Sequence, residues 1–376
     1  MQAKVLPKEF YTAFLSDVAK NRQPSAIRGL FPLEKVPGVI SLLAGKPNAA
    51  TFPFTALSFT ARAPRAGGAE TTLTLDAKAL SDALQYGDTA GQSELLDWLY
   101  ALQARNHGRT RTADWRLSVG AGSQDLIYKA VAALVNPGDS VLVESPVYAG
   151  VLPMFHTLHC NQVDDPYFYL YYGAAPRYPS YFALELEEPE VGRVLRFDSL
   201  SKILSAGIRI GFASGPEPLL AAIDQHTATS NLQTSSLTQA IVTKLLVAWG
   251  HDGFMAHTEG VAAFYKAKRD VFAAAMDTHL AGLAEWAVPE AGMFFWFKLL
   301  AGPDSRALIE TRAFAHGVLA LPGTVFLPNG RATPYVRASF SLAPPEDVDA
   351  ALARLRTAIL AARAEEVEAA AAAAKE

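Results

Sequence analysis

The sequence has almost no cysteine and no long apolar run. Cys160 is the only cysteine among 376 residues, so no disulfide can form within the chain, and a reducing compartment is expected. No apolar run approaches the ~18 residues of a membrane-spanning helix, so we expect no membrane partner. The N-terminal stretch lacks the apolar core of a secretory signal, and Glu9 and Asp17 are unusual in a mitochondrial presequence. These absences predict a cytoplasmic protein.

An excess of charge of one sign is also missing. Lys and Arg number 33 against 37 Asp and Glu, a formal net charge of −4, so no nucleic-acid partner is expected. The eight histidines suggest no metal site, because His156 and His159 lack an acidic or thiol ligand at a useful spacing. Half of the residues are hydrophobic, and a chain of this length favours two domains.

Strand-like and helical segments alternate along the chain. RLSV (116–119) predicts a strand and residues 124–135 a helix, with a tight turn between them. SVLVES (140–145) has no polar alternation, which is typical of a strand buried on both faces of a parallel sheet. Further strands are predicted at 194–199, 294–300 and 335–342. Two long helices are predicted at Ser236–Trp249 and Asp252–His279, and others at 305–317 and 344–366.

Lys202 ends the motif SLSK (199–202) and precedes Arg209 by seven residues. A lysine that holds an aldehyde as an imine needs a polar pocket, since the free amine is the nucleophile. Arginine binds phosphate through its forked donors, and the hydroxyls of Ser199 and Ser201 could serve the same phosphate. Taken alone, a lysine and an arginine at this spacing are more often two solvated charges in a loop. The preceding strand and the serines favour a site.

The sequence GAGSQ (120–124) lies between a predicted strand and a predicted helix. The amides at a helix N-terminus bind phosphate, and Ser123 would add a hydroxyl. The alternative is an ordinary N-cap serine with glycines that allow a tight turn. A dinucleotide site is a third interpretation, but the third glycine of that motif is missing, and no acidic residue convincingly ends a following strand ~20 positions on.

Segments along most of the chain resemble, in the same order, the aminotransferase class I/II family and its kynurenine/2-aminoadipate and fungal aromatic amino acid branch. They include LQYGDTAGQSELLDWL, NPGDSVLVESPVYAG, FDSLSKILSAGIRIGFASGP, WGHDGFMAH and PYVRASFS. The resemblance implies the fold type I α/β architecture, with a large, mostly parallel-sheet domain that binds pyridoxal 5′-phosphate (PLP) and a smaller C-terminal α/β domain. The expected ranges are 1–50 for an N-terminal arm, 51–245 for the large domain and 246–376 for the small domain.

The resemblance also assigns the cofactor site residue by residue. It implies that Lys202 forms the Schiff base with PLP and later moves a proton. It implies that the cofactor phosphate is held by Ser123, Gln124, Ser199, Ser201 and Arg209. The family forms homodimers, and Tyr86 would reach the phosphate in the partner subunit.

The remaining assignments concern the cofactor ring and the substrate. Tyr148 would stack on the ring, Asp164 would pair with its nitrogen, and Tyr167 would donate to its phenolic oxygen. Arg337 would bind the substrate α-carboxylate, and Arg28 the substrate side chain. Taken one at a time, the tyrosines could instead be core residues, Asp164 part of a turn, and Arg337 half of a surface ion pair.

The chain departs from the family between Tyr148 and Asp164, where only 15 residues remain. The family has a long stretch there, with an Asn-Pro-Gly-type turn whose asparagine contacts the cofactor. A parallel crossover unit takes ~30 residues, so about two such units are absent. Two accounts remain open: an incomplete gene reading or splice form of a normal enzyme, which we favour, or a real deletion in an inactive homologue.

The expected reaction is transamination, in which an amino acid donates its amine to PLP and 2-oxoglutarate accepts it. Tyr86, Phe294 and Phe295 favour an aromatic donor, with kynurenine or 2-aminoadipate next. The partners are therefore amino acids and 2-oxo acids. The alternatives from the sequence are a homologue without a working PLP site, a PLP-dependent lyase on the same fold, and an NAD oxidoreductase.

Overall fold

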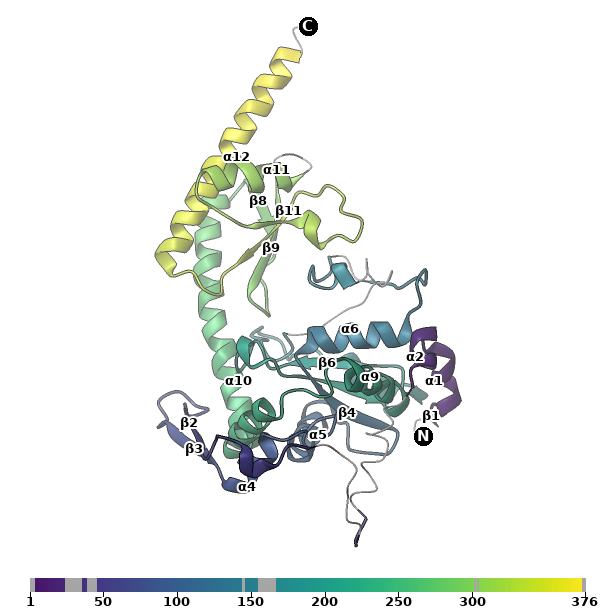
Figure 1. Cartoon of the computed structure of the whole chain (residues 1–376). Coiled ribbons are helices and arrows are strands. Elements are labelled where there is room, and N and C mark those ends of the chain that lie inside the picture. The colour runs from purple at the N-terminus through teal and green to yellow at the C-terminus, as the bar shows by residue number, and fades with distance from the viewer. Residues whose placement is uncertain are drawn as a thin grey trace. The chain divides into compact units, whose positions relative to one another are not determined.

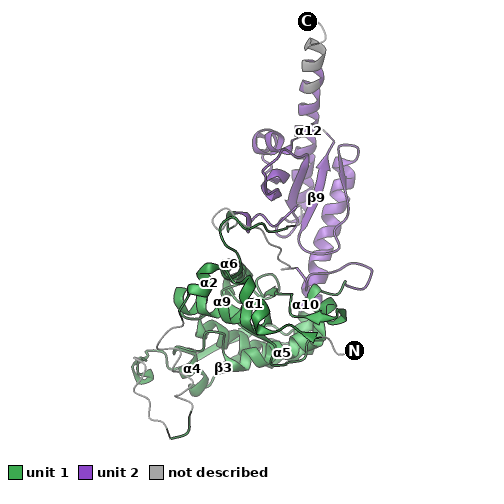
Figure 2. Cartoon of the chain, turned by 90° about the vertical axis from the view of Figure 1, so that its right-hand side faces the viewer, with its two compact units in different colours: residues 1–142, 153–166, 178–257 green, residues 143–152, 167–177, 258–376 purple. Residues whose placement is uncertain are grey.

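The computed structural model describes residues 4–23, 36–38, 46–143, 146–154, 167–300, 302 and 304–373. The chain divides into two compact units (Figure 2): unit 1 is residues 1–142, 153–166 and 178–257, and unit 2 is residues 143–152, 167–177 and 258–376. The predicted domain ranges remain a prediction. The units differ from them because two short segments, 143–152 and 167–177, belong with the C-terminal part.

The central sheet of unit 1 has three strands in the order β4-β7-β6 (Figure 1). These are β4 (Trp115–Gly120), β7 (Gly211–Pro216) and β6 (Arg196–Ser199). Successive side chains of a strand point to opposite faces, and helices cover both. On one face, the ring of Trp115 packs against that of Tyr100 in α5 (Ser93–His107). On the other face, the guanidinium of Arg116 donates a hydrogen bond to the carboxylate of Asp224 in α9 (Glu217–Ser230).

The sheet differs from the predicted, mostly parallel one. Within the described residues, β7 pairs antiparallel with both β4 and β6. The strand predicted at 140–145 is wrong for residues 140–143, which are irregular, and Leu142 is 97% exposed. A parallel strand needs neighbours to satisfy its backbone groups. The segment predicted to be missing after Tyr148 would supply such neighbours.

Short elements of unit 1 complete its core. The N-terminal β1 (Lys4–Val5) pairs in parallel with β5 (Glu190–Val191), and α1 (Lys8–Phe14) and α2 (Asp17–Asn21) follow it. The hydroxyl of Ser16 caps α2 and donates to the carbonyl of Ala132, which anchors this arm to α6 (Ser123–Leu134). A hairpin of β2 (Leu57–Ala61) and β3 (Thr71–Leu75) leads into α4 (Ala77–Ala83).

The long helix α10 (Ser236–Leu280) confirms the two predicted helical stretches and the break between them. Gly250 has φ 63° and ψ 178°, values outside the helical region, at the position between Trp249 and His251. Glycine tolerates this conformation because it has no Cβ. The chain of α10 belongs to unit 1 up to His257 and to unit 2 from Thr258.

Unit 2 is built on an antiparallel sheet in the order β10-β11-β9-β8. The strands are β8 (Ala284–Trp286), β9 (Phe294–Leu299), β10 (Leu321–Pro322) and β11 (Tyr335–Ser339). In the sequence, the short helix α11 (Ser305–Ala307) lies between β9 and β10, and the long helix α12 (Pro345–Ala373) follows β11. Burial alternates along β9, so Phe295 is fully buried and stacks on Phe272 at 5.0 Å. The interpretation of Phe295 as a substrate-lining residue is therefore wrong, because it points into the core.

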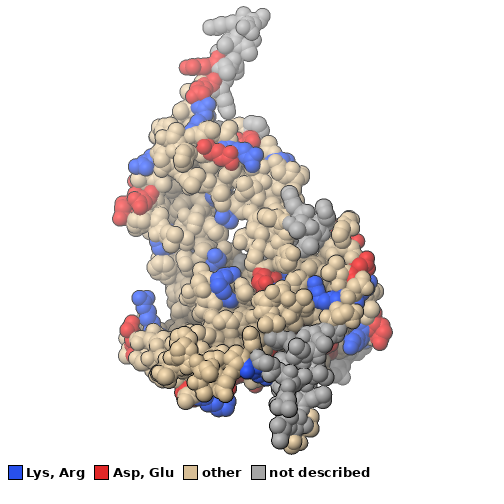
Figure 3. Space-filling view, viewed as in Figure 1, with Lys and Arg blue, Asp and Glu red and all other residues tan. Residues whose placement is uncertain are grey.

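Three further properties of the described residues concern membranes, surface charge and metal ions. None of the described helices is both long and apolar enough to cross a membrane. On the face shown in Figure 3, positive and negative side chains are scattered among each other. Among the described residues, no group of three or more His, Cys, Asp or Glu is arranged to hold a metal ion.

His226 of α9 makes unfolding sensitive to acid. Burial, with Arg22 and then Lys129 adding to it, lowers the pKa of His226 below the ordinary value of 6.5. The unfolded chain therefore takes up the proton first, so stability is complete above about pH 6.5 and is lost as pH falls below it. We expect the Tm of the wild type to fall more between about pH 7.5 and about pH 5.5 than that of His226→Phe, which keeps a ring against Tyr128. Parallel curves for the two proteins would contradict this.

Candidate active site

Lys202 lies in a turn that directly follows β6. The turn is closed on the carbonyl of Leu200, which accepts amides from Ile203, Leu204 and Ser205 at 3.3, 2.9 and 3.4 Å. Leu200 and Ile203 are buried, so the turn is anchored on both sides of the lysine. Lys202 itself is partly buried and has no hydrogen bond or ion pair within the part of the chain that the structure describes. Its amine is available for chemistry.

The loop before α6 leads into the first backbone amides of that helix. The N-cap residue is Gly122, with φ 96° and ψ 164°, and no side chain caps the helix. The alternative interpretation of Ser123 as an N-cap serine is therefore wrong, since Ser123 is the first residue of the helix. The first amides of a helix have no intrahelical acceptor, and the helix dipole favours an anion there. One nearby carboxylate, that of Asp125, accepts from the amide of Ala121 at 3.3 Å.

Arg209 joins the Lys202 turn to this loop. Its guanidinium donates to the hydroxyl of Ser201 at 3.2 Å, to the carbonyl of Ala206 at 3.1 Å and to the carbonyl of Ala121 at 3.2 Å. Arg209 has φ 50°, a left-handed conformation that is unfavourable for a side chain of this size. Arg209 is exposed, and its guanidinium lies beside the start of α6, so the loop and the arginine form one cradle, defined by residues 120–124 and Arg209.

The serines of the motif complete the cradle. The hydroxyl of Ser199 accepts from the amide of Ser201 at 3.2 Å, and Ser199 is nearly buried at the end of β6. Gly211, at the start of β7, lies opposite Ser199, and a Cβ there would lie 2.7 Å from the amide nitrogen of Ser123. The structure thus brings together Ser123, Ser199, Ser201 and Arg209 around the turn that carries Lys202. Gln124 follows Ser123 in the first turn of the same helix.

A second group of predicted residues lies in unit 2 around Arg337. The Arg337 guanidinium lies over the rings of Phe294 at 4.0 Å and Phe326 at 4.5 Å. Burial lowers its pKa, and the phenols of Tyr167 and Tyr148 oppose that shift, so both tyrosines are its electrostatic neighbours. Among the described residues it has no hydrogen bond or ion pair. The interpretation of Arg337 as half of a surface ion pair is therefore not supported.

Tyr148 and Tyr167 are fixed by contacts within unit 2. The amide of Val147 donates to the carbonyl of Phe326 at 3.0 Å, which places the neighbouring Tyr148 near this aromatic pair. The ring of Tyr167 meets that of Phe294 edge-on at 6.1 Å. Both were assigned to the cofactor ring, and that assignment stays a prediction.

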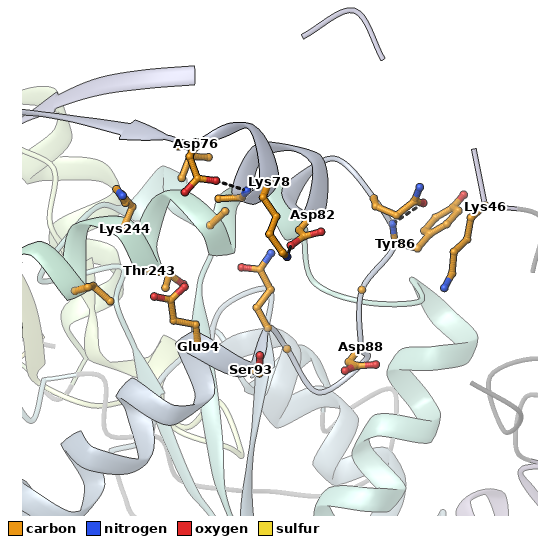
Figure 4. A pocket seen from close by; sticks show the side chains of 18 residues that line it. Lys46, Asp76, Lys78, Asp82, Tyr86, Asp88, Ser93, Glu94, Thr243 and Lys244 are labelled. Atoms are coloured by element: carbon orange, nitrogen blue, oxygen red, sulfur yellow. Dashed lines mark hydrogen bonds and ion pairs between the residues drawn. The ribbon is translucent and has the colours of Figure 1, made fainter. Parts of the chain in front are cut away.

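Three further predictions fall elsewhere. Tyr86 is 53% exposed and lines a cavity of about 620 Å³ in unit 1 together with Lys46, Asp82 and Lys244 (Figure 4). That cavity does not include Lys202. Arg28 and Asp164 lie outside the described residues.

Sequence reasoning missed Phe326 and the Ala121 carbonyl. Phe326 lies in the 3₁₀ turn Gly323–Phe326, far from Phe294 in sequence, and no local pattern indicated that the two rings would enclose one guanidinium. The carbonyl of Ala121 carries no side-chain signal at all. Its position between two glycines was the only hint that the loop backbone would be accessible.

Comparison with known proteins identifies the family. The family described as aminotransferase class I and II matches residues 59–163 and 161–355. The chain belongs to this family, whose members are PLP-dependent aminotransferases of fold type I. The predicted fold class, cofactor and reaction class are thereby confirmed, and the NAD oxidoreductase interpretation is wrong.

Individual relatives agree with this assignment. The aminotransferase tdiD of Emericella nidulans is 35% identical over 414 residues, which cover 92% of this chain and 94% of the relative. The mitochondrial kynurenine/alpha-aminoadipate aminotransferase of Bos taurus is 33% identical over 426 residues, covering 92% and 98%. The crystal structure of the aminotransferase Aro8 from Candida albicans superposes with a TM-score of 0.84 at 22% identity, covering 96% of this chain and 99% of that one.

These comparisons also locate the missing segment. The match to tdiD runs over 414 residues although this chain has 376, so the relative has residues with no counterpart here. The family match is split at residues 161–163, inside the short interval between Tyr148 and Asp164. Both observations agree with a missing segment in this interval, which stays a prediction.

The residues of the cradle fit the phosphate of PLP. A Cβ at Gly122 would lie 2.5 Å from Nη2 of Arg209, so only glycine leaves this space free. Helix N-terminal amides, an exposed guanidinium and serine hydroxyls are the donors that a phosphate requires. The lysine that would bind the cofactor lies in the turn between Ser201 and the arginine. The donor set therefore agrees with the cofactor that the family implies.

Replacing Gly122 by Ala should weaken cofactor binding without unfolding unit 1. The added Cβ would displace the Arg209 guanidinium, so we expect the Kd for PLP to rise by about tenfold. Gly138→Ala is the matched control, since Gly138 has φ 93° and nothing within 4 Å of an added Cβ. Both variants should lose about 1 kcal/mol of stability through the positive φ. Equal cofactor affinity of the two variants, measured by fluorescence titration, would show that the loop does not bind the phosphate.

Proposed function

We propose that this protein transaminates aromatic amino acids, with kynurenine and 2-aminoadipate as further donors and 2-oxoglutarate as the acceptor. The observation that carries the proposal is the environment of Arg337. A guanidinium without a described polar partner, held between two phenylalanine rings, suits a carboxylate attached to an apolar side chain. The name of the bovine relative, a kynurenine/alpha-aminoadipate aminotransferase, supports kynurenine and 2-aminoadipate as donors.

The proposed role of each residue follows from the chemistry of its side chain or backbone group. PLP, when bound, supplies the carbonyl that exchanges the amine and a ring that withdraws electrons from the substrate α-carbon. The amine of Lys202 would hold the cofactor and move the α-proton, because it lies in the turn next to the cradle and has no described polar partner. Arg209 and the first amides of α6 would fix the phosphate. Arg337 would orient the substrate through its carboxylate, with Tyr148 and Tyr167 at its side.

Initial rates with a set of donors test the substrate class. Phenylalanine, tyrosine, tryptophan, kynurenine and 2-aminoadipate should each be assayed with 2-oxoglutarate, using alanine and aspartate as comparison donors. We expect the aromatic donors to have the highest kcat/KM, and oxo acid to form in equal amount to glutamate. A preference for aspartate or alanine would refute the proposed class, and ammonia as a product would indicate a lyase.

The assembly and location belong to the proposal as well. A homodimer is supported by the exposed position of Tyr86, the residue expected to reach the partner subunit. Light scattering should give twice the mass of the chain. Cytoplasmic location is supported by the single cysteine, whereas the bovine relative is named as mitochondrial. Cell fractionation would distinguish the two compartments.

One observation favours a second candidate, a homologue without catalytic activity. β6 has β7 as its only strand partner among the described residues, and Leu142 is almost fully exposed. An incomplete sheet with exposed apolar residues reduces stability and promotes association. If this candidate is right, the 376-residue chain will aggregate and fail to bind PLP, while a chain with the missing segment restored will be active.

A further inference from the structure

The turn that carries Lys202 is tied to helix α10 by a histidine. The Nε2 atom of His257 lies 2.6 Å from the carbonyl oxygen of Ile203, the residue after Lys202. A carbonyl oxygen only accepts hydrogen bonds, so Nε2 must carry the proton and donate it. Both residues belong to unit 1. This bond joins two segments more than fifty residues apart in the chain.

The ring of His257 is itself held in place. It packs against the indole of Trp249, one helical segment earlier in α10, with ring centroids 4.7 Å apart and planes inclined by 37°. The two residues lie on either side of the break at Gly250. The ring is therefore oriented by an aromatic contact while its nitrogen donates to the turn.

Lys202 depends on this anchor because its own side chain has none. The amine has no described hydrogen bond or ion pair, so the backbone of the turn sets its position. On one side the turn is fixed by Leu200, whose amide donates to the carbonyl of Ile210 at 3.1 Å. On the other side, the turn is held to α10 by the hydrogen bond from Nε2 of His257 to the carbonyl of Ile203.

We propose that His257 is a positioning residue for Lys202, holding the turn so that the lysine amine points into the cradle. The inference rests on the proposed catalytic role of Lys202. Loss of the bond would let the residue after the lysine move, and a displacement of about 1 Å at a reacting group costs up to about 100-fold in rate.

Helix α10 contains a second histidine, His251, that serves as a matched control. His251 also stacks on a tryptophan, Trp98, at 4.4 Å and 11°, and its Nε2 also meets a backbone carbonyl, that of Trp98, at 3.0 Å. Its contacts are with α5, not with the Lys202 turn. His251→Phe and His257→Phe remove the same kind of bond and keep a ring, so a merely structural role would affect both variants alike.

The test measures the reactivity of Lys202 in the chain without cofactor. Acetylation by an amine-reactive reagent is followed by mass spectrometry of the Lys202 peptide, with exposed Lys266 as the internal reference. We expect His257→Phe to raise the Lys202 labelling rate by about threefold or more, because the turn opens locally. His251→Phe should leave it unchanged, and His257→Gln, which retains a donor, should restore most of the wild-type rate.

Kinetics of the loaded enzyme give the second measurement. In His257→Phe we expect kcat to fall by about tenfold or more with KM for the donor little changed, since the substrate-binding residues are untouched. Equal labelling and equal kcat in the two phenylalanine variants would overturn the positioning role. If Lys202→Ala retains full activity, the proposed function fails instead, and the labelling result still reports on the bond itself.

Discussion

Lys202→Ala should lose essentially all transaminase activity, with kcat lower by about 10³-fold or more. In the proposed roles the amine would supply both the covalent bond to the cofactor and the base that moves the substrate proton, and among the described residues no other lysine lies in this turn. Lys202→Arg should be equally inactive, because a guanidinium is protonated at neutral pH and is not nucleophilic. The measurement is a stopped or continuous assay of oxo acid formation at saturating donor.

Lys266 provides the control for that result. It is an exposed lysine on α10 that forms an ion pair with Asp270 at 3.6 Å and has no contact with the cradle. Lys266→Ala should keep wild-type kcat. If Lys202→Ala keeps more than about a tenth of the activity, Lys202 is not the cofactor lysine.

Arg337→Gln is expected to lower kcat/KM by about 100-fold for every amino acid donor. Two charge-assisted hydrogen bonds to a carboxylate contribute about 3 kcal/mol together, which corresponds to about 100-fold. Arg337→Lys should be intermediate, since an ammonium retains the charge but not the fork. Exposed Arg331, six residues earlier, provides the control variant Arg331→Gln, which should behave as wild type.

A substrate without the carboxylate separates this effect from general damage. Phenylalanine and 2-phenylethylamine differ only in that group, so the wild type should prefer phenylalanine strongly. In Arg337→Gln that preference should largely disappear, because the change removes the group that recognises the carboxylate. A variant that loses activity but keeps the full preference would show that Arg337 does not bind the carboxylate.

Local sequence patterns predicted the elements that depend on local physics. The two helical stretches of α10 could be predicted directly, because helix periodicity leaves a mark in the sequence. The strand-turn-helix unit of β4 and α6 was predicted for the same reason, and it carries half of the cradle.

Features that depend on long-range packing could not be predicted from local sequence patterns. The apolar stretch around Leu142 looks like a buried strand, but among the described residues no strand pairs with it, and Leu142 is exposed. The burial of Phe295 is decided by which face of β9 meets Phe272, and the enclosure of Arg337 by Phe326 depends on the return of a distant turn. The bond from His257 to the Lys202 turn is of the same kind, since neither partner indicates it alone.

The central claim is that the cradle beside Lys202 binds PLP in the chain as it stands, since the residues that form it lie outside the missing segment. Its most direct test is the visible absorption spectrum of the purified 376-residue chain with PLP, before and after addition of phenylalanine. We predict an absorption band that is absent in Lys202→Ala and bleaches when phenylalanine is added. A spectrum identical to that of free PLP, unchanged by the mutation and by phenylalanine, would contradict the claim.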